Sequence, residues 1–158
     1  MNNYKIIKTR FIIIRMGNQA SIKKINYEDV QYILKNKNGS LLINTLDANN
    51  QVCLIKNTIN IQEEESIINT TLQKNDTFIV IYGKNCNDET IYKKYTQLIS
   101  LGFIHVYLYT AGLFEWLCLQ DIYGAELFPT TAKELDILKF KPPSLFTQRG
   151  LLMDMNRY

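Results

Sequence analysis

Residues 78–116 read FIVIYGKNCNDETIYKKYTQLISLGFIHVYLYTAGLFEW, a stretch in which apolar runs alternate with polar loops. The run at 78–82 is rich in β-forming residues and ends abruptly in polar ones, as a buried parallel strand does. An amphipathic segment follows, with Asn87 as the expected helix N-cap and Gly102 as the helix stop. A second apolar run covers 105–109. This order predicts a right-handed strand–helix–strand unit, whose loops open at the carboxyl edge of a parallel sheet, where open α/β folds bind ligands.

The segments before this unit carry shorter patterns of the same kind. We expect a helix N-cap at Asn26, strands at 22–25, 40–45 and 59–61, and a helix at 62–73. The three glutamates that open that helix complement the helix dipole and are not spaced to complete a metal site.

The unit contains, in order, the segments IVIY (79–82), a polar loop, a helix, LGF (101–103), VY (106–107), AG (111–112) and Trp116. This order resembles the second half of a rhodanese-like, sulfurtransferase-type domain. Upstream, residues 41–44 and 55–61 resemble the earlier strands of that family. The resemblance implies an α/β fold in which a parallel sheet of about five strands has helices on both faces. It also implies three parts: an N-terminal extension at 1–20, a rhodanese-like domain at 21–128, and a C-terminal helix and strap at 129–158.

The chemistry implied by the resemblance depends on the loop after the strand that ends in Tyr82. Catalytic members of the family carry a persulfide-forming cysteine at the position that is Gly83 here, and a basic residue at the position that is Asp88. In the strand before, an acidic position of the family is taken by Asn44. These departures imply a degenerate site and a non-catalytic binding or regulatory module. The alternative is a thiosulfate or persulfide sulfurtransferase in which Cys86 carries the sulfur.

Acidic residues in the same loop disfavour that alternative. Asp88 and Glu89 would raise the pKa of a neighbouring thiol and repel an anionic sulfur donor. Lys84 and the start of the next helix act in the opposite direction. The candidate residues for binding an anion or another ligand are those of this loop: Gly83, Lys84, Asn85, Asn87, Asp88, Glu89 and Thr90.

The sequence lacks the motifs that other kinds of active or binding site require. A phosphatase loop would need an arginine five or six residues after Cys86, where Ile91 and Tyr92 stand. The lone His105 has no acid or cysteine nearby in sequence and is expected to be structural. We expect no metal site and no cofactor. The net charge of +3 is too weak to indicate nucleic-acid binding, so the expected partners are a protein or a small sulfur-containing anion.

The N-terminal residues suggest a second feature. Met16 and Gly17 begin MGNQAS, which matches the N-myristoylation pattern if Met16 is the true initiator. The other interpretation is an internal linker. The three cysteines, Cys53, Cys86 and Cys118, lack metal or redox spacing, which favours a reducing, cytoplasmic location. Membrane contact would then arise only through the acyl chain on Gly17.

The C-terminal third combines an apolar helix with an apolar tail. Residues 113–123 predict a buried helix, and Thr131 with Glu134 forms a capping box that predicts a short helix up to about Phe140. We expect residues 120–131 to close over the loop pocket. The tail at 144–158 either packs on the domain as a strap or offers an apolar strip to a partner.

Overall fold

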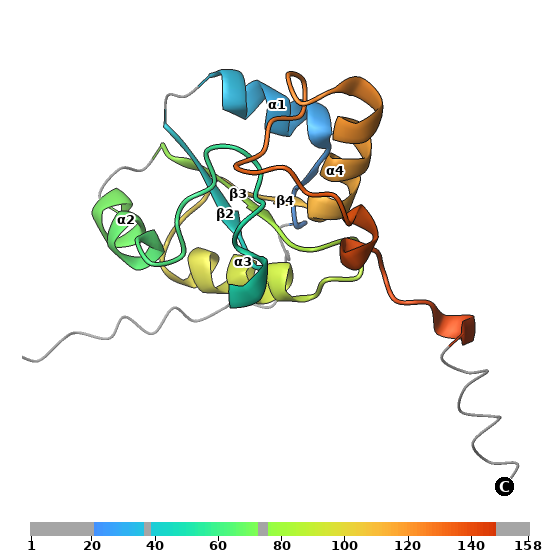
Figure 1. Ribbon diagram of the computed structural model, residues 1–158. Helices are drawn as coiled ribbons and strands as arrows, with labels where there is room; N and C mark the ends of the chain where they lie inside the picture. Colours follow the sequence, from blue (N-terminus) through green and yellow to red (C-terminus); the bar gives the residue numbers. More distant parts are fainter. Residues whose placement is uncertain (1–20, 37–38, 73–75, 148–158) are drawn as a thin grey trace, which may run out of the picture.

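A parallel sheet with strand order β1-β4-β3-β2 forms the centre of the computed structural model, which describes residues 21–36, 39–72 and 76–147 (Figure 1). Within these residues the sheet has four strands: β1 (Lys24–Ile25), β2 (Ser40–Asn44), β3 (Phe78–Tyr82) and β4 (Val106–Tyr109). Central β3 pairs with β2 from Ser40↔Phe78 to Asn44↔Tyr82, and with β4 from Ile79↔Val106 to Tyr82↔Tyr109. The register brings the carboxyl ends of β2, β3 and β4 to one edge.

Helices cover both faces of this sheet, as expected. They are α1 (Tyr27–Lys35), α2 (Glu64–Thr71), α3 (Thr90–Ser100) and α4 (Gly112–Tyr123), with 3-10 turns η1 (Ala48–Asn50) and η2 (Ile137–Phe140). Figure 1 shows α1 and α4 on one side of the sheet, and α2 and α3 on the other. The alternation along β3 explains this arrangement, because neighbouring strand residues point to opposite faces. Val80 and Tyr82 pack with α1 and α4, whereas Ile79 and Ile81 pack with α2 and α3.

The fifth expected strand, at 59–61, is wrong. That segment makes one parallel bridge, Leu42↔Thr58, and a hydrogen bond in which the N–H of Ile59 donates to Leu42 O at 2.9 Å. Asn57 just before it has a φ of 64°, which turns the chain sharply. Asn60 then accepts a hydrogen bond from the N–H of Gln62, which starts a turn. The backbone therefore leaves the sheet after a single pairing.

The capping box expected at Thr131 is also wrong. The Thr131 hydroxyl accepts a hydrogen bond from the N–H of Leu54 and donates one to Val52 O, each at 2.9 Å. The side chain therefore joins two segments of the chain instead of starting a helix, and helical structure resumes only in η2. The same segment is anchored by Trp116, whose indole N–H donates to Pro129 O.

In the described ranges, no helix is long and apolar enough to cross a membrane. The MGNQAS motif with Gly17 and the tail after residue 147 lie outside those ranges.

Candidate functional site

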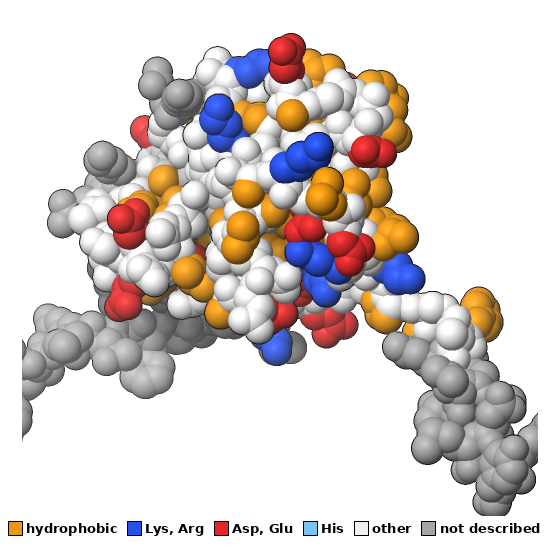
Figure 2. All heavy atoms as spheres, in the orientation of Figure 1, with side chains coloured by type: hydrophobic (Ala, Val, Ile, Leu, Met, Phe, Trp, Pro, Cys, Tyr) orange, Lys and Arg blue, Asp and Glu red, His pale blue; other side chains and the backbone are white. Residues whose placement is uncertain are grey.

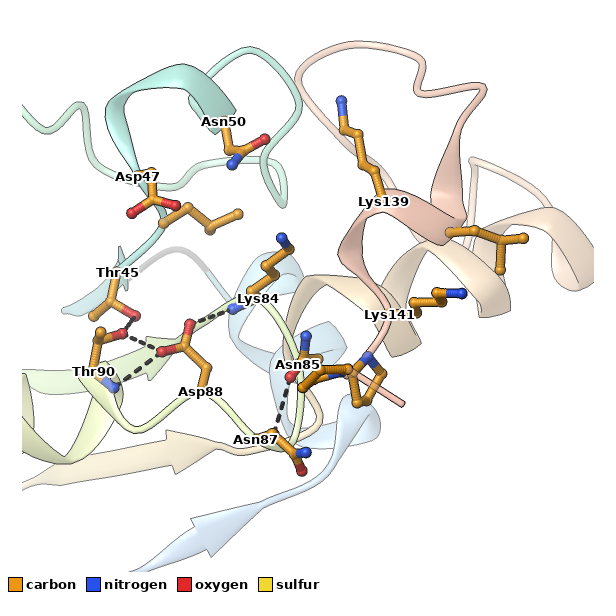
Figure 3. A pocket seen from close by; sticks show the side chains of 14 residues that line it. Thr45, Asp47, Asn50, Lys84, Asn85, Asn87, Asp88, Thr90, Lys139 and Lys141 are labelled. Atoms are coloured by element: carbon orange, nitrogen blue, oxygen red, sulfur yellow. Dashed lines mark hydrogen bonds between the residues drawn. The ribbon is translucent and has the colours of Figure 1, made fainter. Parts of the chain in front are cut away.

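The loop between β3 and α3 lies at the carboxyl edge of the sheet, where ligands were expected to bind (Figure 3). Tyr82 ends β3 and is fully buried. Its hydroxyl accepts a hydrogen bond from the N–H of Ile55 at 3.2 Å and bonds the Thr58 hydroxyl at 2.8 Å. Burial raises the pKa of Tyr82 well above its usual value. The buried and uncharged Tyr82 side chain therefore fixes the end of β3 immediately before Gly83.

Gly83 has no room for a side chain. A Cβ atom added there would lie 2.8 Å from Cγ of Asp88, closer still to its Oδ2, and 2.9 Å from Cγ2 of Ile91. The Asp88 carboxylate therefore fills the space into which a side chain at position 83 would project.

Asp88 is held in this place by backbone and hydroxyl donors. Its Oδ2 accepts the N–H of Lys84 at 2.8 Å, and its Oδ1 accepts the N–H of Thr90 at 3.0 Å and the Thr90 hydroxyl (Figure 3). The Thr90 hydroxyl also lies within hydrogen-bond distance of the Thr45 hydroxyl, at 2.7 Å. Hydrogen bonds of this kind to an anion are stronger than neutral ones. The carboxylate thus occupies backbone donors of the loop that a bound anion would otherwise use.

The expected N-cap of the following helix is wrong by two residues. Helix α3 begins at Thr90 and not after Asn87, because Asp88 makes a local turn with the N–H two residues on. The Asn87 side chain instead accepts a weak hydrogen bond from Cys86 Sγ at 3.6 Å. Both Asn and Asp can form such turns, so sequence alone did not separate them.

Cys86 lies on the outside of the loop. Its side chain is exposed, and its Sγ donates a hydrogen bond to the side chain of Asn87 next to it. Cys53 is buried and Cys118 is half-buried, and burial raises the pKa of both thiols. A role for Cys86 as a sulfur carrier stays a prediction.

Hydrogen bonds with two neighbouring elements, η2 and α4, hold the loop in place. The amide of Asn85 donates to Phe140 O at 2.7 Å, and Phe140 is itself buried in the core. At the start of α4, the N–H groups of Leu113 and Phe114 donate to Gly83 O and Lys84 O, at 2.9 and 3.0 Å. The loop backbone is therefore tied to both α4 and η2.

An open hollow of about 610 Å³ lies beside this loop. Its walls come from the loop, from the segment around η1 and from the segment after η2 (Figure 3). The lining residues are Thr45, Leu46, Asp47, Asn50, Lys84, Asn85, Asn87, Asp88, Thr90, Leu138, Lys139, Lys141, Pro142 and Pro143. Of the predicted loop residues, Gly83 and Glu89 do not line it. Residues 120–131, expected to close over the pocket, do not line it either; residues 138–143 form that wall.

The η1 side of the hollow is shaped by Asn44, the position at which the resemblance implies an acidic residue. Its Oδ1 accepts the N–H of Leu46 at 3.0 Å and an amide hydrogen of Gln51 at 2.9 Å. These bonds fold the chain back after β2 and place Asp47 and Asn50 at the rim. Sequence analysis missed these wall residues because their place depends on long-range folding.

Three lysines and two carboxylates give the hollow its charge. Lys84 points into it, between η1 and the segment that carries Lys139 and Lys141 (Figure 3). Lys139 forms an ion pair with Glu134, whose pKa is lowered mainly by the hydrogen bond from Lys139. Figure 2 shows basic and acidic side chains next to each other around η2.

The described residues provide neither a cluster of metal-ligating side chains nor a histidine near the loop. These contain no group of three His, Cys, Asp or Glu side chains that could hold a metal ion. His105 stacks on Phe78 with ring centroids 4.9 Å apart, at the opposite end of β3 from the loop. Its Nδ1 is buried without a hydrogen-bond partner among those residues.

Solved structures similar to this chain include the following three. The BH2092 protein from Bacillus halodurans is 20% identical, with a TM-score of 0.51, over 65% of this chain and 74% of that one. The As-Sb reductase from Leishmania major is 16% identical, with a TM-score of 0.52, over 83% of this chain and 98% of that one. The reduced CoADR-RHD of Bacillus anthracis is 21% identical over 58% of this chain and 16% of that one, with a TM-score of 0.45. No family model and no curated protein matches the sequence.

The fold is rhodanese-like. Identities this low show the fold alone, so the chemistry must be argued from the side chains. In this rhodanese-like domain, the position expected to carry the nucleophile is Gly83, and the space beside it is taken by Asp88. The hollow next to the loop, with Lys84 in it, is an open space at the carboxyl edge of the sheet.

Proposed function

We propose that this chain is a non-catalytic, rhodanese-like binding module whose β3–α3 loop carries no sulfur. The observation that supports this most directly is the overlap between a Cβ at position 83 and the Asp88 carboxylate. A persulfide on residue 83 would need both the side chain and the backbone donors that Asp88 uses. The loop keeps its shape while its anion-binding donors are satisfied internally.

A sulfurtransferase that uses Cys86 is the second candidate, because this thiol is exposed in the same loop. In that reaction the Cys86 thiolate would attack the outer sulfur of thiosulfate and release sulfite, leaving a persulfide. Cyanide would then remove the outer sulfur as thiocyanate and restore the thiolate. Against this candidate, the contact of Sγ is a side-chain oxygen rather than a set of backbone N–H groups that would stabilise an anion.

The deciding experiment is intact mass spectrometry of the full chain after incubation with thiosulfate, with and without cyanide. Cys86→Ser and Cys118→Ser are measured in parallel, and an active rhodanese serves as the positive control. We expect no gain of sulfur on any variant under conditions in which the control loads fully. A gain of one sulfur that cyanide removes, and that only Cys86→Ser abolishes, would establish the sulfurtransferase instead.

The proposal also covers the cellular location of the protein and the way in which it would attach to a membrane. We propose a cytoplasmic module that binds a protein or a small anion. Acylation of Gly17 would add a membrane anchor if translation starts at Met16. Intact mass of the protein expressed with an N-myristoyltransferase, from each start codon, tests that addition.

A further inference from the structure

We propose that the open hollow beside the closed loop binds an organic phosphate monoester. The inference rests on the proposed function, because it treats the loop as the wall of a binding site and not as a reaction centre. Asp88 already satisfies the backbone donors at Lys84 and Thr90, so a ligand anion must be held by side chains further out. Those side chains surround the 610 Å³ hollow.

Three of the five charged side chains that line this hollow are lysines. Lys84 is half-buried and points into it, and Lys141 lies on the segment across from Lys84, with its exposed side chain running away from Lys84 in Figure 3. In the parts of the chain that the structure describes, neither lysine forms an ion pair. Lys139 is already paired with Glu134 and contributes less. Asp88 keeps its negative charge although both of its oxygens accept hydrogen bonds, so Asp47 and Asp88 both oppose a bound anion.

The type of cation favours phosphate over carboxylate. An arginine side chain matches a planar carboxylate with two parallel hydrogen bonds, whereas lysine acts as a flexible point charge. The described ranges contain no arginine at all, and lysines alone supply the charge here. A phosphate monoester near neutral pH is close to a dianion and presents several oxygens, which suits flexible ammonium groups that approach from separate positions. A monocarboxylate gains less from the second lysine.

The size and the walls of the hollow require more than an inorganic ion. Pockets of about 300–1,000 Å³ are typical for small organic ligands, and 610 Å³ falls within that range. Part of the lining is apolar, formed by Leu46, Leu138, Pro142 and Pro143. The amides of Asn50 and Asn87 add polar groups at the rim. A phosphate carried on a flat or apolar body therefore matches this surface better than phosphate alone.

The test is a titration of the full chain with phenyl phosphate at about pH 7.5, where the monoester is a dianion. Backbone amide NMR signals report the site, and inorganic phosphate and benzoate serve as comparison ligands. We expect saturable shifts confined to residues 45–50, 84–90 and 138–143, and weaker binding of both comparison ligands. Lys84→Gln and Lys141→Gln should each weaken phenyl phosphate about fivefold or more, because each removes a charge-assisted contact.

Two matched variants distinguish binding in the hollow from non-specific attraction of the anion to lysines on the protein surface. Lys133→Gln removes the same charge from an exposed position that does not line the hollow, and should leave the affinity unchanged. Asp47→Asn removes one of the two opposing carboxylates and should strengthen binding. All variants are first checked for an unchanged urea midpoint, so that a loss of binding is not a loss of folding.

Several outcomes would overturn the inference. These are shifts that never saturate, a loss on Lys133→Gln equal to that on Lys84→Gln, benzoate binding as tightly as phenyl phosphate, or inorganic phosphate binding as tightly. Sulfur loading is measured separately by mass, so the two proposals fail independently. A chain that loads no sulfur and binds no phenyl phosphate refutes only this inference.

Discussion

The carboxylate of Asp88 lies where a side chain on Gly83 would have to be. A Cβ on residue 83 would come within 2.8 Å of Asp88 Cγ, and real Cβ atoms are not found so close to another carbon. The two positions therefore exclude each other: a residue larger than glycine at 83 requires that Asp88 move. This relationship gives a direct test of the closed loop.

The first prediction concerns the energetic coupling of these two positions. Gly83→Ala should lower the unfolding free energy by about 1–3 kcal/mol, as overpacking of a tight site does. Asp88→Ala should also destabilise the domain, because it leaves the N–H groups of Lys84 and Thr90 without their acceptor. The double variant should lose less unfolding free energy than the sum of the two single losses, because the alanine at 83 no longer clashes with the Asp88 carboxylate. Urea unfolding of the four proteins measures the coupling.

Relief in the double variant will be incomplete, since Cγ2 of Ile91 also lies 2.9 Å from the added Cβ. Strict additivity of the two single changes would show that the carboxylate does not occupy this space.

The sequence predicted the framework of this molecule better than its loop. Strand β3 occupies the residues expected for it, and β4 begins one residue later than expected, because long apolar runs bounded by polar residues specify buried strands locally. The edge elements were harder. The expected strand at 59–61 depends on how Asn57 turns the chain, which no local pattern reveals.

The second prediction compares two aspartates on the same hollow. Asp88→Asn keeps the size of the side chain but replaces an acceptor oxygen with a donor group, so one of its loop contacts is lost. We expect a destabilisation of about 0.5–2 kcal/mol, as for the loss of a helix-cap side chain. Asp47→Asn makes the same chemical change at an exposed side chain that caps nothing, and should leave the urea midpoint unchanged. Equal effects of the two changes would contradict the role assigned to Asp88.

The third prediction concerns alkaline stability. Burial raises the pKa of Tyr82 and, with the hydrogen bond to Glu115, that of Tyr109 above the usual value of 10.0. The unfolded chain therefore releases these protons at lower pH than the folded one. Their contribution is complete below about pH 10, and above it each tyrosine should reduce the unfolding free energy by about 1.4 kcal/mol per pH unit.

Urea unfolding at a series of pH values above about pH 9 measures this slope. Tyr82→Phe removes one of the two groups and should make the slope shallower, although it also lowers stability at neutral pH because the N–H of Ile55 loses its acceptor. An unchanged slope in Tyr82→Phe would show that Tyr82 ionises as easily in the folded chain as in the unfolded one.

The fourth prediction separates the thiols. Cys86 is exposed, whereas burial raises the pKa of Cys53 and Cys118 and lowers the fraction of reactive thiolate. With an excess of an aromatic disulfide reagent at neutral pH, we expect one fast phase from Cys86 followed by slower ones. Cys86→Ser should remove the fast phase alone. A fast phase that persists in Cys86→Ser would place the accessible thiol elsewhere.

The candidate site could be predicted in part, and the reason is geometric. The resemblance pointed to the loop at residues 83–90, which a local pattern can identify, and its assignment of Gly83 to the nucleophile position stays a prediction. The opposite wall comes from residues 138–143, more than fifty positions away, and reaches the loop through the hydrogen bond from Asn85 to Phe140 O. Only the folded chain brings Lys141 across from Lys84.

Gly112, the first residue of α4, carries a further consequence. It has a φ of 70°, and a Cβ there would lie 2.6 Å from Gly83 O and 2.9 Å from Asn85 N. The start of α4 therefore contacts the loop backbone so closely that it limits the path that this backbone can take. A substitution in the loop that leaves these contacts intact would change the groups presented to the hollow without changing the path of the backbone.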